Sequence, residues 1–156
     1  MIDSIEASFG IYLATLIVSV LSGLIPVVNG EVYLIAAILV AKDPVVAIAL
    51  AVLVAVGQML AKIVLYYAAR GATELGRSTR FGDKLQKAQA LIDRWKNKPL
   101  TLLFISAVTG LPPFYLVSLL AGVVGIRFPV FLFLGLLGRV IRFVVLALAV
   151  LYWGVR

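Results

Sequence analysis

Residues 23–31 read Gly23-Leu24-Ile25-Pro26-Val27-Val28-Asn29-Gly30-Glu31 and interrupt an apolar region that extends from residue 5 to residue 41. Pro26 lacks an amide donor and Gly30 is conformationally free, so this stretch breaks a helix. Asn29 can accept hydrogen bonds from the first turn of a new helix. The stretch therefore predicts two apolar helical arms, residues 5–23 and 31–41, joined at a break that contains Pro26 and Gly30.

A second interruption repeats this pattern at Gly110-Leu111-Pro112-Pro113. After each break comes a short apolar arm, then a basic-x-Pro triplet, then a long apolar stretch. The triplets are Lys42-Asp43-Pro44 and Arg127-Phe128-Pro129, and the long stretches are residues 44–69 and 129–153. Paired apolar segments interrupted by Gly and Pro at corresponding places are typical of transporters built from internal repeats. We therefore expect one membrane domain, residues 1–156, with repeats at 5–69 and 99–156.

The composition assigns these apolar stretches to a membrane. The chain has 156 residues, of which 63% are hydrophobic and 13% charged, and its mean hydropathy is +1.15. Soluble domains are about half apolar and a quarter charged. Lipid must therefore solvate most of this chain, and the fold class is an all-α polytopic membrane protein.

The arms around the breaks are too short for ordinary spans. The arm from Pro26 to Ala41 and the arm from Pro113 to Ile126 fall short of the roughly 20 residues that a crossing requires. Short arms joined at a Pro/Gly break predict re-entrant hairpins, with breaks at Pro26, Gly30, Gly110, Pro112 and Pro113. We expect an inverted repeat with two such hairpins and about three transmembrane helices. Four or five ordinary kinked spans are the alternative.

Residues 70–98 form a basic block, with eight basic residues against three acidic ones, a net charge of +5. In a membrane protein such a block predicts a cytoplasmic segment. Its apolar residues recur every three or four positions from Phe81 to Trp95, which indicates an amphipathic helix. That helix lies either on anionic lipid headgroups or against the protein's own cytoplasmic face. Nucleic acid is not an expected partner, because no soluble module is present to bind it.

The basic block also orients the chain. Span 44–69 then runs inward, the two hairpins enter from opposite leaflets, and the two repeats are inverted copies. We expect an integral protein of a prokaryotic cytoplasmic membrane. Because the N-terminal residues contain no Lys or Arg, no cleaved signal peptide is expected.

Three stretches of the sequence resemble the DedA family, also called the VTT-domain or SNARE-associated Golgi protein superfamily. They are Pro26 to Glu31, Gly57-Gln58 followed by Tyr66 to Gly71, and Phe104 to Gly125 with Pro112 and Ala121-Gly122. The resemblance covers most of residues 20–150. It implies two re-entrant hairpins and movement of lipids across a bilayer, either phospholipid scrambling or recycling of a lipid-phosphate carrier, in some members with a dependence on proton motive force.

The chain departs from the family pattern at its charged positions. Many members carry arginines beside the proline of the second hairpin, where this chain has Ser106, Thr109 and Phe114-Tyr115. The family's usual acid after the first hairpin is replaced around Gln58. The chain is therefore similar to a short, divergent member.

Two arginines, Arg139 and Arg142, lie well inside the last apolar span. A charged residue near the bilayer centre costs about 2.5–3.5 kcal/mol on insertion scales, so it marks a candidate site. Their i, i+3 spacing places both on one helix face, where two guanidinium groups could hold a lipid phosphate. In the structural alternative, they pair with Glu31 or bind hairpin carbonyls.

Four further residues complete the predicted substrate site. Glu31 could take up a proton and gate release of an anion, or could simply complement the start of a helix. Asn29 flanks a break whose exposed amides suit an anion. Gln58 and Lys62 belong to a polar stripe with Tyr66 that could line a path for a headgroup. Alternatively, Lys62 extends toward the surface and the tyrosines form an interfacial aromatic belt.

The expected function is therefore a transporter of lipids, whose partners are anionic headgroups or lipid phosphates and, in one version, protons. The alternatives are a proton- or ion-coupled transporter of a small solute and a non-transporting scaffold that could form a homo-oligomer. An enzyme, a metal site and a cofactor are not expected, because the chain has neither His nor Cys and no acid pair at depth.

Overall fold

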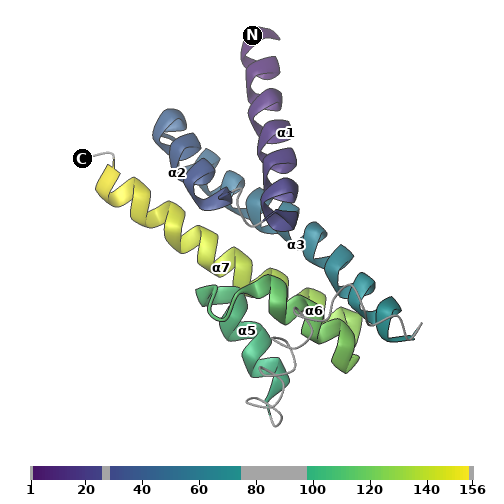
Figure 1. The fold of residues 1–156 in the computed structure, drawn as a ribbon. Helices are drawn as coiled ribbons and strands as arrows, with labels where there is room; N and C mark the ends of the chain where they lie inside the picture. Colours follow the sequence, from purple (N-terminus) through teal and green to yellow (C-terminus); the bar gives the residue numbers. More distant parts are fainter. Residues whose placement is uncertain (1, 26–28, 75–97, 155–156) are drawn as a thin grey trace. The chain divides into compact units, whose positions relative to one another are not determined.

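The computed structural model describes residues 2–25, 29–74 and 98–154 (Figure 1). Every element in these ranges is an α-helix, which confirms the all-α class. The helices are α1 (Ile2–Leu24), α2 (Gly30–Ala41), α3 (Pro44–Glu74), α5 (Pro99–Thr109), α6 (Phe114–Val124) and α7 (Phe128–Gly154). Pro26 and nearly all of the predicted amphipathic segment lie outside the described residues.

Two helices, α3 and α7, are long and apolar enough to cross a membrane. Their apolar parts, Pro44–Ala72 and Phe128–Gly154, have 29 and 27 residues and the same mean hydropathy of 2.3. At 1.5 Å per residue each reaches about 40 Å, more than the roughly 30 Å of a bilayer's hydrocarbon core. Large apolar side chains along both helices are exposed, among them Val45, Val64, Phe133 and Val145. These helices indicate a membrane protein.

The short helices end where the local sequence stops them. α2 closes at Lys42, whose backbone is left-handed with φ 52°. Asp43 Oδ1 then accepts hydrogen bonds from the amides of Val45 and Val46, at 2.7 and 3.0 Å, and so caps α3. α5 ends at Gly110 with φ 77°, a conformation that glycine adopts without steric cost. The polar triplet after α2 thus acts as a turn and a helix cap.

The two interrupted regions differ in the lengths of their helices. α5 and α6 have 11 residues each, about 16 Å, and α2 has 12, about 18 Å. α1 has 23 residues, about 34 Å. In the described residues, the order of a helix, a shorter or equal helix and a long helix therefore occurs twice along the chain.

The chain forms two compact units, and the boundary between them falls inside both long helices. Unit 1 comprises residues 1–61 and 140–156, and unit 2 comprises residues 62–139. Each unit thus contains one interrupted region and a portion of α3 and of α7. The division into sequence repeats at 5–69 and 99–156 stays a prediction, since it concerns internal similarity rather than compactness.

Glycines allow close helix packing within each unit. In unit 1, a Cβ atom on Gly57 of α3 would lie 2.6 Å from the Cβ of Ser19, and one on Gly23 would lie 2.6 Å from the Cβ of Ala61. In unit 2, a Cβ atom on Gly122 of α6 would collide with the carbonyl oxygen of Tyr66. The helices approach so closely only because these positions carry no side chain.

Candidate functional site

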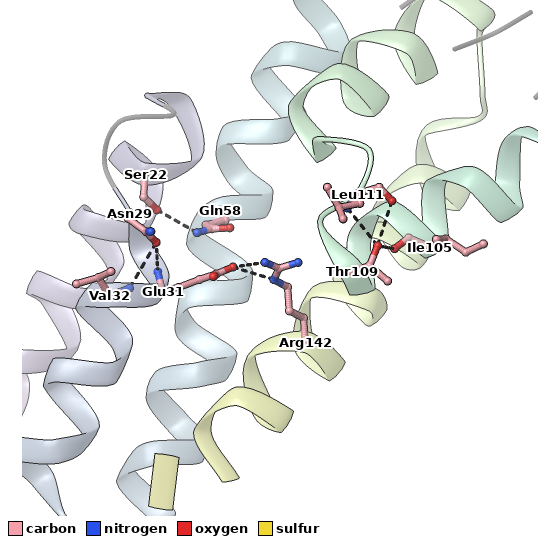
Figure 2. A network of polar contacts seen from close by, with 9 residues as sticks. All are labelled: Ser22, Asn29, Glu31, Val32, Gln58, Ile105, Thr109, Leu111 and Arg142. Atoms are coloured by element: carbon pink, nitrogen blue, oxygen red, sulfur yellow. Dashed lines mark hydrogen bonds and ion pairs between the residues drawn. The ribbon is translucent and has the colours of Figure 1, made fainter. Parts of the chain in front are cut away.

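The break between α1 and α2 in unit 1 packs directly on Gln58 of α3. A Cβ atom on Gly30 would lie 2.7 Å from both Gln58 Nε2 and Ser22 Oγ, so a side chain there would displace these two polar groups. Gln58 Nε2 in turn donates a hydrogen bond of 3.1 Å to Ser22 Oγ (Figure 2). Because Gly30 has no side chain, the backbone at this position can pass close to the buried side-chain amide of Gln58. Gln58 therefore contributes a polar group next to the break.

Asn29 starts α2. Its Oδ1 atom accepts hydrogen bonds from the amides of Glu31 at 3.0 Å and Val32 at 3.4 Å. This arrangement satisfies amides that a helix otherwise leaves without intrahelical partners. Because Asn29 Oδ1 serves these amides, the structure gives this residue a structural role in the first turn.

The central feature of unit 1 is an ion pair between Glu31 and Arg142, which are 111 residues apart in the sequence. Arg142 Nε donates a hydrogen bond of 2.9 Å to Glu31 Oε1, and Arg142 Nη2 donates to the same oxygen. The relative exposure of the two side chains is 24% for Arg142 and 37% for Glu31. Figure 2 shows both side chains extended toward each other from α7 and α2. Both side chains of the ion pair are therefore only partly buried.

The pairing changes the electrostatics expected for the last span. A lone guanidinium among apolar helices is costly, and a carboxylate at hydrogen-bond distance offsets much of that cost. Glu31 is one residue past the capping Asn29, so the first turn of α2 also favours its negative charge. Arg142 and Glu31 form an overall neutral pair at this point in unit 1.

The other predicted arginine, Arg139, belongs to unit 2 and has different neighbours. Its guanidinium carbon lies 4.6 Å from the centroid of the Phe114 ring, and the residue is 9% exposed. Lys62 of α3 is 5% exposed. Unit 2 therefore holds two buried cations, and the joint action of Arg139 with Arg142 stays a prediction.

At the second break, which lies in unit 2, the hydroxyl groups of Ser106 and Thr109 form hydrogen bonds with the backbone around the break. Ser106 Oγ donates a hydrogen bond of 2.5 Å to the carbonyl of Pro112. Thr109 Oγ1 lies 2.8 Å from the carbonyl oxygen of Ile105 and 3.0 Å from that of Leu111, which share its one proton, and it accepts a hydrogen bond of 3.1 Å from the amide of Leu111 (Figure 2). The Leu111–Pro112 peptide bond is cis. Internal hydrogen bonds thus occupy several polar groups that an anion would otherwise contact.

The expectation that Tyr66 and Tyr67 form an aromatic belt is wrong for Tyr66. Tyr66 is fully buried, and its hydroxyl donates a hydrogen bond of 2.5 Å to the carbonyl of Ile126. Its ring stacks on Phe131 with centroids 4.8 Å apart. Tyr67 is half exposed. Tertiary packing with α7 takes Tyr66 into the core of unit 2.

The structure brings four of the predicted site residues together in unit 1, namely Asn29, Glu31, Gln58 and Arg142. Lys62 and Arg139 are both buried in unit 2. Sequence reasoning missed Ser22 and Phe114 as neighbours of these groups. Each directly flanks an interruption, Ser22 before Gly23 and Phe114 after Pro113, and that position was the available signal.

A comparison with known families agrees with this architecture. Residues 24–152 match the family model described as the VTT domain. The match contains α3, nearly all of α7, nearly all of the first break, the whole of the second, and every candidate residue named above except Ser22. Neither the curated proteins nor the solved structures contain a significant match to the chain.

Proposed function

Because the chain belongs to the VTT-domain family, we propose that it is a membrane transporter that moves an anionic lipid, either a phospholipid or a lipid-phosphate carrier, across the bilayer. The ion pair of Glu31 with Arg142 carries the proposal. Its guanidinium donates two hydrogen bonds to one carboxylate oxygen of Glu31. That oxygen occupies the place that a lipid phosphate would take.

In this proposal the interrupted regions are re-entrant hairpins. The 11 or 12 residues of α2, α5 and α6 reach about 16–18 Å, little more than half of a hydrocarbon core. A helix of this length that starts at one surface ends inside the membrane. Non-helical backbone at that depth is tolerated where protein buries it or where it lines a cavity. The two breaks would then lie at the depth where a headgroup must cross.

The proposed mechanism is an exchange of anions on Arg142. The guanidinium donates through Nε and Nη2 to Glu31 Oε1, the fork that also matches two oxygens of a phosphate. Both side chains are partly exposed, so an entering phosphate can reach them. As the phosphate binds Arg142, Glu31 is released, and protonation of its carboxyl favours the released state. Return of the carboxylate to Arg142 then displaces the lipid.

The same proposal gives the chain an orientation. The +5 block at residues 70–98 lies on the cytoplasmic side of a prokaryotic inner membrane, where it meets anionic headgroups. In this proposal, lipids enter the site laterally from the bilayer. Their movement requires no covalent chemistry, so the proposed activity is transport and not that of an enzyme.

One observation favours a competing candidate, a membrane scaffold without transport activity. Arg142 already has a carboxylate partner within its own unit, and a buried or half-buried ion pair can serve to fix how helices associate. A scaffold requires the pair to stay closed, whereas a transporter requires it to open.

Reconstitution into liposomes separates these candidates. The full chain is placed in vesicles that contain a headgroup-labelled anionic phospholipid or a labelled lipid phosphate, and transbilayer movement is followed by chemical quenching of outer-leaflet label. We expect movement well above that of empty vesicles, and at least a tenfold slower rate in Arg142→Gln. Glu31→Gln keeps the guanidinium but lacks the competing carboxylate, so we expect it to bind lipid and release it slowly.

The double variant E31Q/R142Q and a matched control make the result interpretable. The double variant removes both charges together, so it avoids leaving one charge unpaired, and we expect it to fold and to be inactive. Arg127→Gln removes an exposed arginine and should retain the full rate. Wild-type activity in the folded double variant, or no movement by the wild-type protein with either lipid, contradicts the proposal.

A further inference from the structure

Helix α1 carries a row of hydroxyl groups on one face. Thr15, Ser19 and Ser22 follow one another at i, i+4 and i+7, a spacing that aligns them along the helix. Thr15 and Ser19 are fully buried, whereas the large apolar side chains of the opposite face are exposed, namely Phe9, Leu13, Ile17 and Leu21. In a chain that lipid solvates, this distribution directs the hydroxyl face of α1 toward the protein.

The proton of each of these hydroxyl groups is used within α1. Thr15 Oγ1 donates to the carbonyl of Ile11 at 2.6 Å, and Ser19 Oγ donates to that of Thr15 at 2.5 Å. Ser22 Oγ donates to the carbonyl of Ser19 at 2.9 Å. A hydroxyl has one proton and two lone pairs, so toward other helices these oxygens act as acceptors. The hydroxyl face of α1 is therefore a face of hydrogen-bond acceptors.

Donors from α2 and α3 contact this face within unit 1. The Tyr33 hydroxyl of α2 lies 2.9 Å from Thr15 Oγ1, and Tyr33 is the donor because the Thr15 proton is directed to Ile11. Gln58 Nε2 of α3 donates to Ser22 Oγ at 3.1 Å. These two hydrogen bonds connect α1 to both neighbouring helices.

Both contacts hold the first turn of α2, which carries Glu31. A Cβ atom on Gly30 would lie 2.7 Å from Ser22 Oγ and from Gln58 Nε2, so the backbone directly before Glu31 packs on this hydrogen bond. Gly30 and Tyr33 are three residues apart and share one face of α2. Glu31 lies about 100° around the helix from Gly30. Holding that face against α1 and α3 therefore fixes the direction in which Glu31 points.

We propose that α1 orients Glu31 for its ion pair with Arg142, with Ser22 and Tyr33 as the positioning residues. Figure 2 shows the bond between Ser22 and Gln58 beside the turn from which Glu31 extends toward Arg142. The inference rests on the proposed exchange of anions at Arg142. It gives a role in that exchange to a helix that lies almost entirely before the start of the family match at residue 24.

The physical reason is preorganisation. A carboxylate that is already held in the bound direction loses little conformational freedom when the ion pair closes, so it competes well with an incoming phosphate. If the first turn of α2 can rotate, Glu31 returns to Arg142 less often. The lipid phosphate then binds Arg142 more tightly and leaves it more slowly.

The dependence of transport on lipid concentration tests this role. The full-length protein is placed in phosphatidylcholine vesicles with increasing mole fractions of N-labelled phosphatidylethanolamine, which is anionic. Ser22→Ala and Tyr33→Phe each remove one hydrogen bond to the hydroxyl face and keep Glu31 and Arg142. We expect the half-saturating mole fraction to fall about threefold, the typical worth of one hydrogen bond between membrane helices, and the maximal rate to fall as well.

Ser19→Ala is the matched control. It removes a buried hydroxyl of the same face whose hydrogen bond lies within α1, and it keeps the Cβ atom beside Gly57. Both transport parameters should stay at their wild-type values. In a Glu31→Gln background, Ser22→Ala should cause no further shift, because the carboxylate that it orients is absent. The proposal is overturned by an equal shift in Ser19→Ala, by a shift that persists without Glu31, or by wild-type values in both Ser22→Ala and Tyr33→Phe.

A double-mutant cycle followed by thermal unfolding distinguishes failure of this inference from failure of the proposed function, since it requires no lipid movement. If Ser22 acts through Glu31, we expect Arg142→Gln to lower Tm about half as far in Ser22→Ala as in the wild-type background. Equal losses in a protein that moves lipid and needs Arg142 overturn the positioning role and leave the exchange standing. Non-additive losses in a wild-type protein that moves no lipid overturn the proposed function and leave the orientation of Glu31 by α1 standing.

Discussion

The two units place charge in opposite ways. In unit 1, Arg142 is held by Glu31, so a cation and an anion compensate each other beside a helix break. In unit 2, Lys62 and Arg139 are both buried, and the Arg139 guanidinium lies over the ring of Phe114. Arg139 and Arg142 are one helical turn apart on α7, yet one contacts an aromatic ring and the other a carboxylate. A shared helix face therefore does not establish a shared site.

A compensated pair such as Glu31 with Arg142 is stable without substrate and can open and close. The proposed function therefore assigns the exchange of anions to unit 1. The following predictions concern stability, and each compares a residue of one unit with its counterpart or with a neutral position.

The largest expected effect is steric and lies in unit 2. A side chain at Gly122 would collide with the carbonyl oxygen of Tyr66, a backbone atom that cannot move aside, so Gly122→Val should lower the free energy of unfolding by about 3 kcal/mol. Thermal unfolding in detergent measures this. Gly71→Ala is the control, because nothing lies within 4 Å of a Cβ atom there, and it should be neutral or slightly stabilising. Equal Tm values for the two variants would show that the close approach of α6 to α3 is not a constraint.

The next largest effect is expected when Arg142 is removed from its ion pair with Glu31. Arg142→Gln leaves the Glu31 carboxylate without its cation, and we expect a loss of about 2 kcal/mol, less than for a fully buried pair because both side chains are partly exposed. E31Q/R142Q should recover at least half of this loss. Thermal unfolding of both variants measures the difference. A double variant less stable than the single one would mean that the pair does not act as a unit.

A smaller loss is expected at the start of α2. Asn29→Ala removes the acceptor for the amides of Glu31 and Val32, which should cost about 1 kcal/mol. Asn29→Asp retains the acceptor and should retain most of the stability. Chemical denaturation of the two variants checks this order. If Asn29→Ala were neutral for stability but impaired lipid movement, Asn29 would have a substrate role in place of the capping role.

The smallest expected change is at Lys62, a buried cation of unit 2. Lys62→Met removes the buried charge and keeps a side chain of similar length. We expect the free energy of unfolding to change by less than about 0.5 kcal/mol or to rise. Thermal unfolding without ligand tests it against Arg142→Gln. A loss as large as that of Arg142→Gln would show that Lys62 stabilises the fold, and the charge contrast between the units would fail.

Local chemistry made much of the helical architecture predictable. The long stretch predicted at 44–69 is α3 (Pro44–Glu74), and that predicted at 129–153 is α7 (Phe128–Gly154). Gly110 ends a helix and Asn29 starts one, as their residue types indicated. These outcomes depend on contacts within about four residues. A missing amide donor, a glycine with positive φ and a capping oxygen act on their own turn of chain whatever the rest of the protein does.

The candidate site was predictable as a set of residues but not as a set of contacts. Apolar composition assigned the chain to a membrane, and a charge among apolar residues marked Arg139, Arg142 and Lys62, because lipid penalises any ionised group. Which partner each charge meets was decided by tertiary packing. Glu31 and Arg142 are 111 residues apart, and the partners Ser22 and Gln58 are 36 apart. Periodicity says which side of a helix a residue occupies, but only the packing of that helix on others decides whether the neighbour there is a carboxylate, as for Arg142, or an aromatic ring, as for Arg139.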